Sequence, residues 1–153
     1  MIVGDPENPD AQYRTEFSIK ALTDAGVAVE ALVENVGNWD QAKGNEIVDA
    51  ALAQFGDEIE VVFCNNDGMA LGAAAAIEKH GRKVGEDIYL LGVDALTECQ
   101  EMVKAGTMTG TVLNDHIGQS HAAVDAAVAA LNGEELQNYY WVPYIKVDKA
   151  YFG

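Results

Sequence analysis

The stretch from Ile59 to Ile77, IEVVFCNNDGMALGAAAAI, constrains the fold of this chain most. Val61 to Phe63 is continuously apolar, as in a strand buried on both faces. A polar Asn-Asn-Asp corner follows, and the alanine-rich run after it predicts a closely packed helix. Strand, polar corner and helix in this order are typical of open α/β sheets, which bind ligands at the carboxyl ends of their strands. The corner is therefore the first place to expect a functional site.

Apolar runs and helical patterns alternate along the rest of the chain. Strands are expected at 1–3, 27–33, 59–64, 87–93 and 108–113, and helices at 9–25, 39–55, 67–80, 96–105 and 116–131. This order predicts an α/β fold, a doubly wound parallel sheet flanked by helices. Asn8 should cap the first helix, with Pro9 as its first residue. Pro143 lies in a final extended run, 139–147, and favours an edge or crossing segment there.

Composition excludes several classes of partner. Nine basic and 25 acidic residues give a net charge of −16, which argues against binding nucleic acid or an anionic membrane. No apolar run reaches the roughly 18 residues of a membrane span, so direct membrane insertion is not expected. No signal peptide is visible, although Met1 is not expected to be the natural start. Cys64 and Cys99 are expected to be buried thiols rather than a disulfide.

Polar residues cluster where the predicted strands end. These residues are Asp10, Arg14, Trp39, Asn66, Asp67, Asp94, Asn114 and Asp115. Carboxylates, amides and a guanidinium supply the acceptors and donors that sugar hydroxyls need. A flat indole matches the apolar C–H face of a sugar ring. Together they predict a site for a neutral, hydroxyl-rich ligand.

Structural alternatives exist for most of these residues. Asp10 and Arg14 could form a surface i,i+4 ion pair, and Trp39 could serve packing alone. Asp94 and Asn114 could each cap the helix that follows.

The Asn-Asn-Asp corner divides into three expected roles. Asn66 is expected to face the ligand, although it could be a turn residue. Asp67 is expected to cap the helix, and Asn65 to support the turn.

Enzymatic interpretations have less support. The sequence has no Gly-x-Gly-x-x-Gly or Walker loop. Asp67 and Asp94 could hold Mg²⁺, but no lysine or Ser/Thr signature accompanies them. His116 and His121 are five apart, which does not fit a helical metal pair. We therefore expect a binding protein and not an enzyme, with no cofactor.

Several segments make the sequence similar to a known family. They are NPDAQYR, NWDQA, EVVFCNNDGMALGA, LGVDAL, AGTMTGTVLND and VPYIKVDK, in this order from Asn8 to Lys149. The chain resembles the C-terminal half of the periplasmic galactose/glucose-binding proteins, which are sugar receptors of ABC transporters and chemotaxis with the type I periplasmic-binding fold.

The resemblance implies roles for the strand-end residues. Those that would hydrogen-bond sugar hydroxyls are Asn8, Asp10, Arg14, Asn66, Asp94 and Asn114. Trp39 would stack on one ring face. Asn8 stands where close relatives often have a histidine. Glu60 matches a glutamate that completes a calcium site in the family, so Ca²⁺ is expected only in a full-length parent.

The resemblance also divides the chain. Residues 1–113 would form the C-terminal sugar-binding lobe. Residues 114–141 would be a hinge crossing and a helix that packs on the N-terminal lobe, and 142–153 would cross back. Because that lobe is not in this sequence, the fragment is expected to self-associate through His116 to Leu131, as a homodimer.

The expected function is that of a fragment of an extracytoplasmic solute-binding protein of a sugar ABC transporter. It would bind a hexose such as galactose or glucose between two lobes and present it to a permease and a chemoreceptor. The alternative is the effector-binding domain of a lactose-repressor-type regulator.

Overall fold

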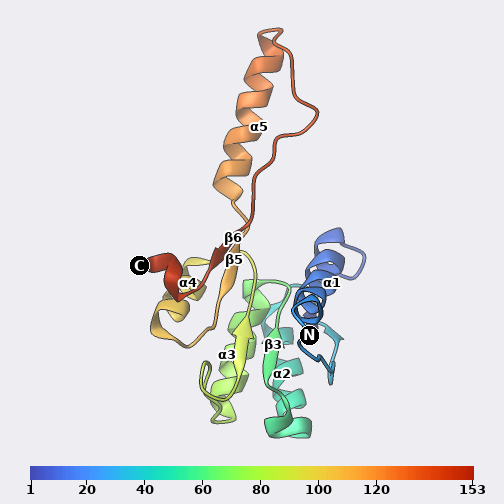
Figure 1. Cartoon of the computed structure of the whole chain (residues 1–153), viewed down its shortest axis with the longest axis vertical. Helices are drawn as coiled ribbons and strands as arrows, with labels where there is room; N and C mark the ends of the chain where they lie inside the picture. The colour runs from blue at the N-terminus through green and yellow to red at the C-terminus, as the bar shows by residue number, and fades with distance from the viewer.

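The computed structural model describes residues 1–153. Its strands are β1 (Ile2–Val3), β2 (Asn35–Val36), β3 (Val61–Phe63), β4 (Tyr89–Leu91), β5 (Thr111–Leu113) and β6 (Ile145–Val147). Its α-helices are α1 (Pro9–Asp24), α2 (Gln41–Phe55), α3 (Asp67–Lys79), α4 (Thr97–Ala105) and α5 (His116–Leu131). Two short 3₁₀ turns, η1 (Gly56–Glu58) and η2 (Lys149–Phe152), complete the chain (Figure 1).

The strands follow one another in the order of a doubly wound sheet. β1 pairs in parallel with β2, and β3 with β4. A single parallel bridge from Ile2 to Cys64 places β1 beside β3, and another from Leu91 to Gly110 places β4 beside β5. The strands therefore lie in the order β2-β1-β3-β4-β5. β6 pairs antiparallel with β5, so the run that contains Pro143 ends in an edge strand, as predicted. In such an order the direction of winding reverses between β1 and β3, which is where ligands bind.

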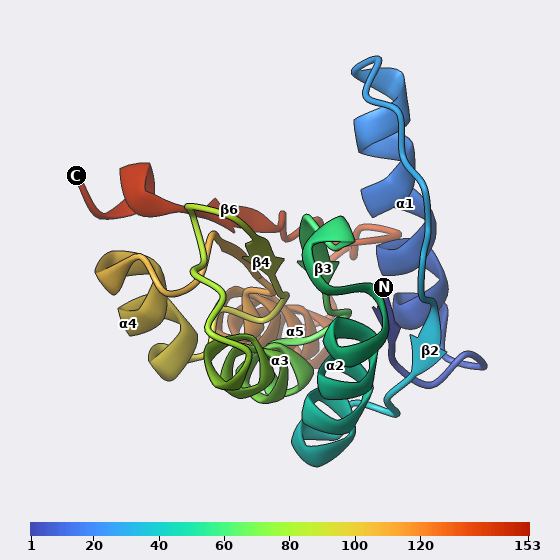
Figure 2. The ribbon, with the colours of Figure 1, turned by 90° about the horizontal axis from the view of Figure 1, so that it is seen from below.

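One face of the sheet is covered by α2 and α3, which lie side by side (Figure 2). Their backbones come unusually close, because each helix presents a glycine to the other. A Cβ at Gly44 would stand 2.4 Å from the Met69 carbonyl oxygen, and one at Gly72 would stand 2.0 Å from that of Gln41. The alanine-rich α3 packs as closely against its neighbours as its sequence predicts. Its residues Ala70, Ala73 and Ala76 are fully buried.

The opposite face is only partly covered. Val62 of β3 is buried towards α2 and α3, whereas Val61 and its partner Tyr89 are almost half exposed. Tyr13 and Phe17, which share one face of α1, are also more than half exposed. The lobe therefore has the predicted α/β class, with part of one sheet face open.

The prediction of a strand at 27–33 is wrong. That segment is irregular, and the paired strand is Asn35–Val36. The reason is that β1 is short: its pairing begins with Met1, whose α-amino group donates to the Val33 carbonyl at 2.8 Å. β1 therefore offers a parallel neighbour to Asn35 and Val36, and residues 27–33 belong to no ladder in this structure.

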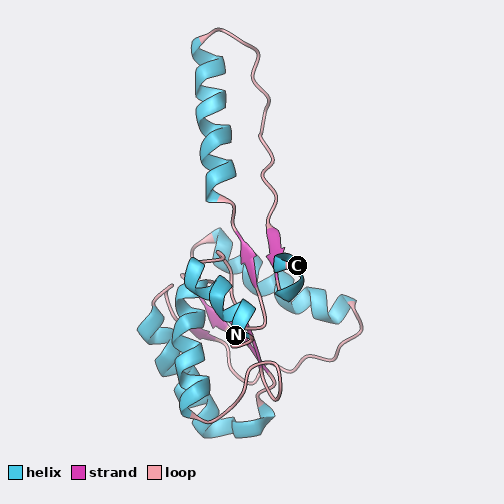
Figure 3. Ribbon diagram, turned by 90° about the vertical axis from the view of Figure 1, so that its left-hand side faces the viewer, coloured by secondary structure: helices cyan, strands magenta, loops and turns pink.

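An arm, residues 114–144, projects from the body (Figure 1). It consists of α5 and the extended segment that returns beside it, and β5 and β6 join it to the body as adjacent strands (Figure 3). The helix has the predicted bounds, His116–Leu131, but none of its residues is buried. None of the helices in the chain is long and apolar enough to cross a membrane.

Candidate functional site

Asn65 anchors the corner at which the winding of the sheet reverses. It is completely buried, and its backbone N–H donates to the Ile2 carbonyl at 2.9 Å. Its side-chain oxygen accepts from the Gly4 N–H at 3.0 Å, and its Nδ2 donates to Thr15 Oγ1 at 3.1 Å. Asn65 thus ties the ends of β1 and β3 to α1, a larger role than the turn support expected of it.

The roles expected of Asn66 and Asp67 need correction. Asn66 caps α3, because its side-chain oxygen accepts from the Met69 N–H at 3.0 Å. Asp67 is the first helical residue, and its buried carboxylate accepts from Thr111 Oγ1 at 2.7 Å and from the Leu96 N–H at 2.8 Å. Asp67 therefore holds β5 and the loop after β4 in place. Burial raises the pKa of this carboxyl, and the bonds from Thr111 and Leu96 oppose the rise.

The side-chain NH₂ group of Asn66 remains largely unpaired at the edge of the polar cluster. Its Nδ2 makes one long contact, 3.4 Å to the Trp39 carbonyl oxygen, and the residue is partly exposed. Asn66 consequently combines a capping oxygen with an amide group at the edge of the site.

Arg14 is the centre of the polar cluster. Its side chain is only 9% exposed, and Nη1 donates to the Asn65 carbonyl at 2.9 Å. Nη2 lies 3.2 Å from Asp10 Oδ2, and Nη1 lies 3.6 Å from Asp94 Oδ1. The Asp10–Arg14 pair is therefore part of a larger cluster and not an isolated surface pair.

Arg14 also contacts the indole, and it keeps one donor unused. The guanidinium carbon lies 5.8 Å from the centre of the Trp39 ring, within cation–π range. The buried Nε has no hydrogen-bond partner in the chain. A buried donor of this kind is costly unless a ligand or water satisfies it.

Trp39 lies directly over Gly4. A Cβ at Gly4 would stand 2.3 Å from Cη2 and Cζ2 of the indole, so only glycine permits this ring position. Trp39 also has a positive φ of 66°, as does Asn38 before it, at 50°. The loop before α2 is thus held in an uncommon conformation that sets the ring at the edge of the site.

Asp94 is not a helix cap, which removes one alternative. The cap position of α4 belongs to Leu96, without a side-chain bond. Asp94 has a φ of 122° and Ala95 one of 55°, and two such residues in sequence indicate backbone strain. The Asp94 side chain is 31% exposed. Burial raises the pKa of Asp94 to about 6, although Arg14 acts to lower it.

The two remaining residues predicted for the site, Asn8 and Asn114, lie outside the tight polar cluster. Asn8 caps α1, because its side-chain oxygen accepts from the Asp10 N–H at 2.9 Å. Asn114 does not cap α5, since Asp115 accepts from the Gly118 N–H instead. The side-chain oxygen of Asn114 accepts from Gln119 Nε2 at 2.7 Å. The chain brings Asp10, Arg14, Trp39 and Asp94 together most tightly, with Asn66 beside Trp39.

Tyr144 belongs to the cluster and was missed in the sequence. Its hydroxyl accepts from Arg14 Nη2 at 3.3 Å, across a separation of 130 residues. It lies one residue before β6, where the arm returns to the body. Local pattern gives no sign of such a contact; the only available signal was an aromatic residue in a segment expected to cross the sheet edge.

Other candidate features have different roles. Cys64 and Cys99 are free, buried thiols, as predicted; burial raises the pKa of Cys64 to about 12 and also raises that of Cys99. Glu60 is exposed and lies one residue before β3. No three His, Cys, Asp or Glu side chains lie close enough to hold a metal ion.

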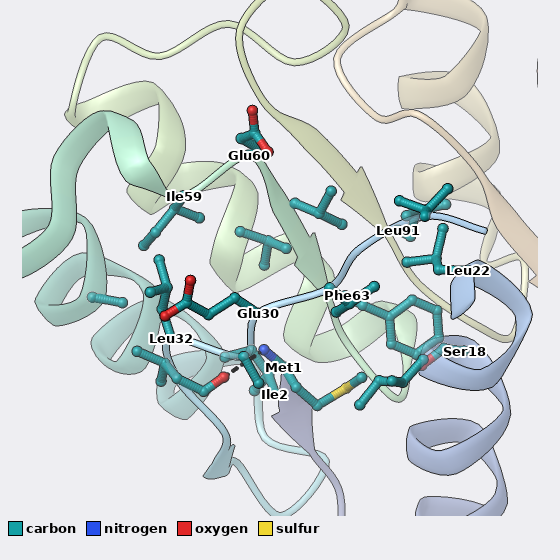
Figure 4. A pocket seen from close by; sticks show the side chains of 18 of the residues that line it. Met1, Ile2, Ser18, Leu22, Glu30, Leu32, Ile59, Glu60, Phe63 and Leu91 are labelled. Carbon is teal, nitrogen blue, oxygen red and sulfur yellow. Dashed lines mark hydrogen bonds between the residues drawn. The ribbon is translucent and has the colours of Figure 1, made fainter. Parts of the chain in front are cut away.

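A cavity of about 440 Å³ lies away from the polar cluster, between α1, the segment 27–33, α2 and the residues that lead into β3. Its lining includes Met1, Leu22, Leu32 and Phe63 (Figure 4). The lining is mostly apolar and lacks the converging donors and acceptors that a sugar needs. The polar cluster is therefore the better candidate for a hydroxyl-rich ligand.

The cluster has one cation and two carboxylates, so it disfavours anionic ligands such as phosphate esters. Its acceptors, donors and indole suit a neutral polyol. The family described as periplasmic binding protein domain matches residues 1–135. The chain belongs to this family.

Two curated relatives are similar to the chain along almost its entire length. The D-galactose/methyl-galactoside binding periplasmic protein MglB of Haemophilus influenzae is 37% identical over 163 residues, which cover 100% of this chain and 48% of that protein. A putative rhizopine-binding protein of Rhizobium meliloti is 30% identical, over 98% of this chain and 48% of its own length. The chain spans about half the length of these curated relatives.

Solved structures of periplasmic binding proteins have the same fold. An ABC transporter periplasmic solute binding protein from Actinobacillus succinogenes, with bound D-allose, superposes with a TM-score of 0.89 at 25% identity, covering 97% of this chain and 52% of that one. A solute binding protein from Bacillus halodurans, with bound myo-inositol, gives 0.85 at 31% identity, over 97% and 50% of the two chains.

Proposed function

We propose that this chain forms one wall of the sugar-binding cleft of an ABC-transporter solute-binding protein. The observation that carries the proposal is the buried Arg14 guanidinium, which joins Asp10, Asp94 and Trp39 at the carboxyl edge of the sheet. Its buried Nε has no hydrogen-bond partner within the chain. The relatives include proteins named for binding galactosides or allose and a solved structure with bound myo-inositol. These names support a neutral polyol as the ligand of this chain.

Each side chain has a distinct task in this proposal. The carboxylates of Asp10 and Asp94 accept from sugar hydroxyls, and Arg14 and Asn66 donate to sugar oxygens. Trp39 covers an apolar ring face. Asn8 and Asn114 add amide groups at the two margins of the cleft. No step of bond breaking is involved, so the role is binding without catalysis.

The preferred ligand that we propose is a hexose, galactose or glucose. Its support is the 37% identity to MglB over the entire chain. Residues 1–113 would form the lobe, 114–141 a crossing whose helix packs on a second lobe in a full-length protein, and 142–153 the return. The full-length protein would work outside the cytoplasm with an ABC permease and a chemoreceptor, and Glu60 would join a Ca²⁺ site there.

Calorimetry tests this function. A full-length protein is expected to bind galactose or glucose with micromolar or tighter affinity, and Arg14→Met or Asp94→Asn to weaken binding by more than about tenfold. The 153 residues alone are expected to bind weakly, because one wall supplies half of the contacts. Failure of all hexoses and inositols to bind the full-length protein would contradict the proposal.

One observation favours a second candidate, an effector-binding domain of a transcription regulator. The HTH-type transcriptional repressor PurR of Pasteurella multocida is 38% identical over 95 residues, which cover 61% of this chain. That match is shorter than the match to MglB. A regulator of this class would bind a DNA operator in a mobility-shift assay, whereas a transport receptor would not.

A further inference from the structure

The arm presents an apolar stripe with no cover in the chain. Four large aliphatic side chains of α5 are exposed: Ile117 by 58%, Val124 by 61%, Val128 by 51% and Leu131 by 88%. Exposed apolar side chains on a projecting helix are a typical signature of an interaction surface.

The stripe lies on the side of α5 that faces away from the rest of the arm. An α-helix turns by about 100° per residue, so Ile117, Val124, Val128 and Leu131 share one face. The opposite face carries Gln119, Ala122, Ala123 and Ala126, which line a groove against the returning Tyr140, Trp141 and Val142. The returning segment therefore covers the alanine side of α5 and leaves the aliphatic stripe for a partner.

The charge distribution favours a second copy of this chain as the partner. The chain has a net charge of −16, which makes most of its surface repel another copy. α5 has a single charged residue in its sequence, HIGQSHAAVDAAVAAL, and that residue, Asp125, lies beside the stripe and not on it. The arm is thus a place where two copies can approach without opposing carboxylates.

We propose that the chain in isolation forms a two-fold symmetric dimer through this stripe, with the two α5 helices antiparallel. The positions of the stripe are self-complementary in that arrangement. Val124 lies midway between Ile117 and Leu131, seven residues from each, so Val124 meets its own copy on the two-fold axis. Ile117 of one copy then faces Leu131 of the other, as an isologous interface requires. The 16 residues give a contact about 24 Å long.

Mass measurement is the first test. Light scattering over a range of concentrations should show the mass rise from 16.4 kDa towards twice that value. Val124→Glu should weaken self-association more than about 100-fold, because two unpaired carboxylates would meet on the axis of a buried interface. Ala130→Glu, on the same helix but away from the stripe, is the matched control and should leave the dimer intact. Circular dichroism should report the same helix content for each variant.

Cross-linking tests the symmetry. Val124→Cys should form an intermolecular disulfide under mild oxidation, because a residue on the axis lies opposite itself at a distance a disulfide can span. Ala130→Cys should not. The native thiols, Cys64 and Cys99, are buried and do not compete.

Two results would overturn the proposal. One is a constant monomer mass for the unsubstituted chain at all concentrations. The other is equal cross-linking of the Val124→Cys and Ala130→Cys variants. If the chain stays monomeric but forms a one-to-one complex with a separately produced N-terminal half of MglB type, the stripe serves that half and not a second copy. None of these outcomes depends on whether the site binds sugar.

Discussion

Replacing Arg14 by Met should destabilise the protein more near pH 7.5 than near pH 5. The substitution keeps an apolar stem but removes the guanidinium that binds the Asn65 carbonyl and faces Asp94 and Asp10. A hydrogen bond from a charged donor to a buried carbonyl contributes about 2 kcal/mol. The ion pair with the partly exposed Asp94 adds about 1 kcal/mol, and the i,i+4 pair with Asp10 adds a few tenths.

The pH dependence follows from the raised pKa of Asp94, about 6. The folded state binds this proton more tightly than the unfolded state, so the contribution of Asp94 to stability is fully present below about pH 4 and is lost as pH rises through about 6. Without Arg14 the carboxylate has no cation beside it, and the loss grows. We expect a destabilisation of about 3 kcal/mol near pH 7.5 and about 2 kcal/mol near pH 5, where Asp94 is mostly protonated.

Urea unfolding followed by circular dichroism measures both values. A double-mutant cycle with Asp94→Asn isolates the pair, with a coupling of about 1 kcal/mol near pH 7.5 and close to zero near pH 5. Equal destabilisation at the two pH values would refute the argument, because it would mean that Arg14 does not stabilise the Asp94 carboxylate.

Three further predictions concern the same site and the core. Gly4→Ala should cost about 1–3 kcal/mol and shift the fluorescence of Trp39 in a Trp141→Phe background, because the new methyl group would overlap the indole; unchanged emission would show that the ring does not lie on Gly4. Sugar affinity in a full-length protein should rise as pH increases through about 6, because hydroxyls donate to the ionised Asp94. Calorimetry in buffers of different ionisation enthalpy should then detect proton release on binding, and a flat affinity profile would contradict it. Cys64 and Cys99 should resist alkylation near pH 8 until the protein unfolds; fast labelling of the native protein would show that they are accessible.

Local pattern was sufficient for most of the fold. The periodicity of α5 gave both of its ends, and Asn8 and Pro9 gave the start of α1, because caps and apolar spacing are properties of neighbouring residues. The segment 27–33 has the composition of a strand, but strand formation also needs a paired neighbour. β1 provides one for only two residues.

The site was predicted in position but not in detail. The residues that follow each strand were identifiable because parallel strands end at one edge. The division of roles among Asn65, Asn66 and Asp67 could not be predicted, since it depends on the direction in which each side chain points in the turn between β3 and α3. Tyr144 was missed because its contact with Arg14 spans 130 residues, and no local spacing encodes such a distance.

The paired glycines between α2 and α3 bear on how proteins with this fold can change their ligand specificity. Gly44 and Gly72 bring the two backbones into contact, and Asn45 Nδ2 donates across the same junction to the Gly72 carbonyl at 3.0 Å. Trp39 and Asn66 stand just before the first turns of these two helices, so main-chain packing fixes their spacing. Side chains around the cleft can then be exchanged in evolution while the frame that carries them stays unchanged.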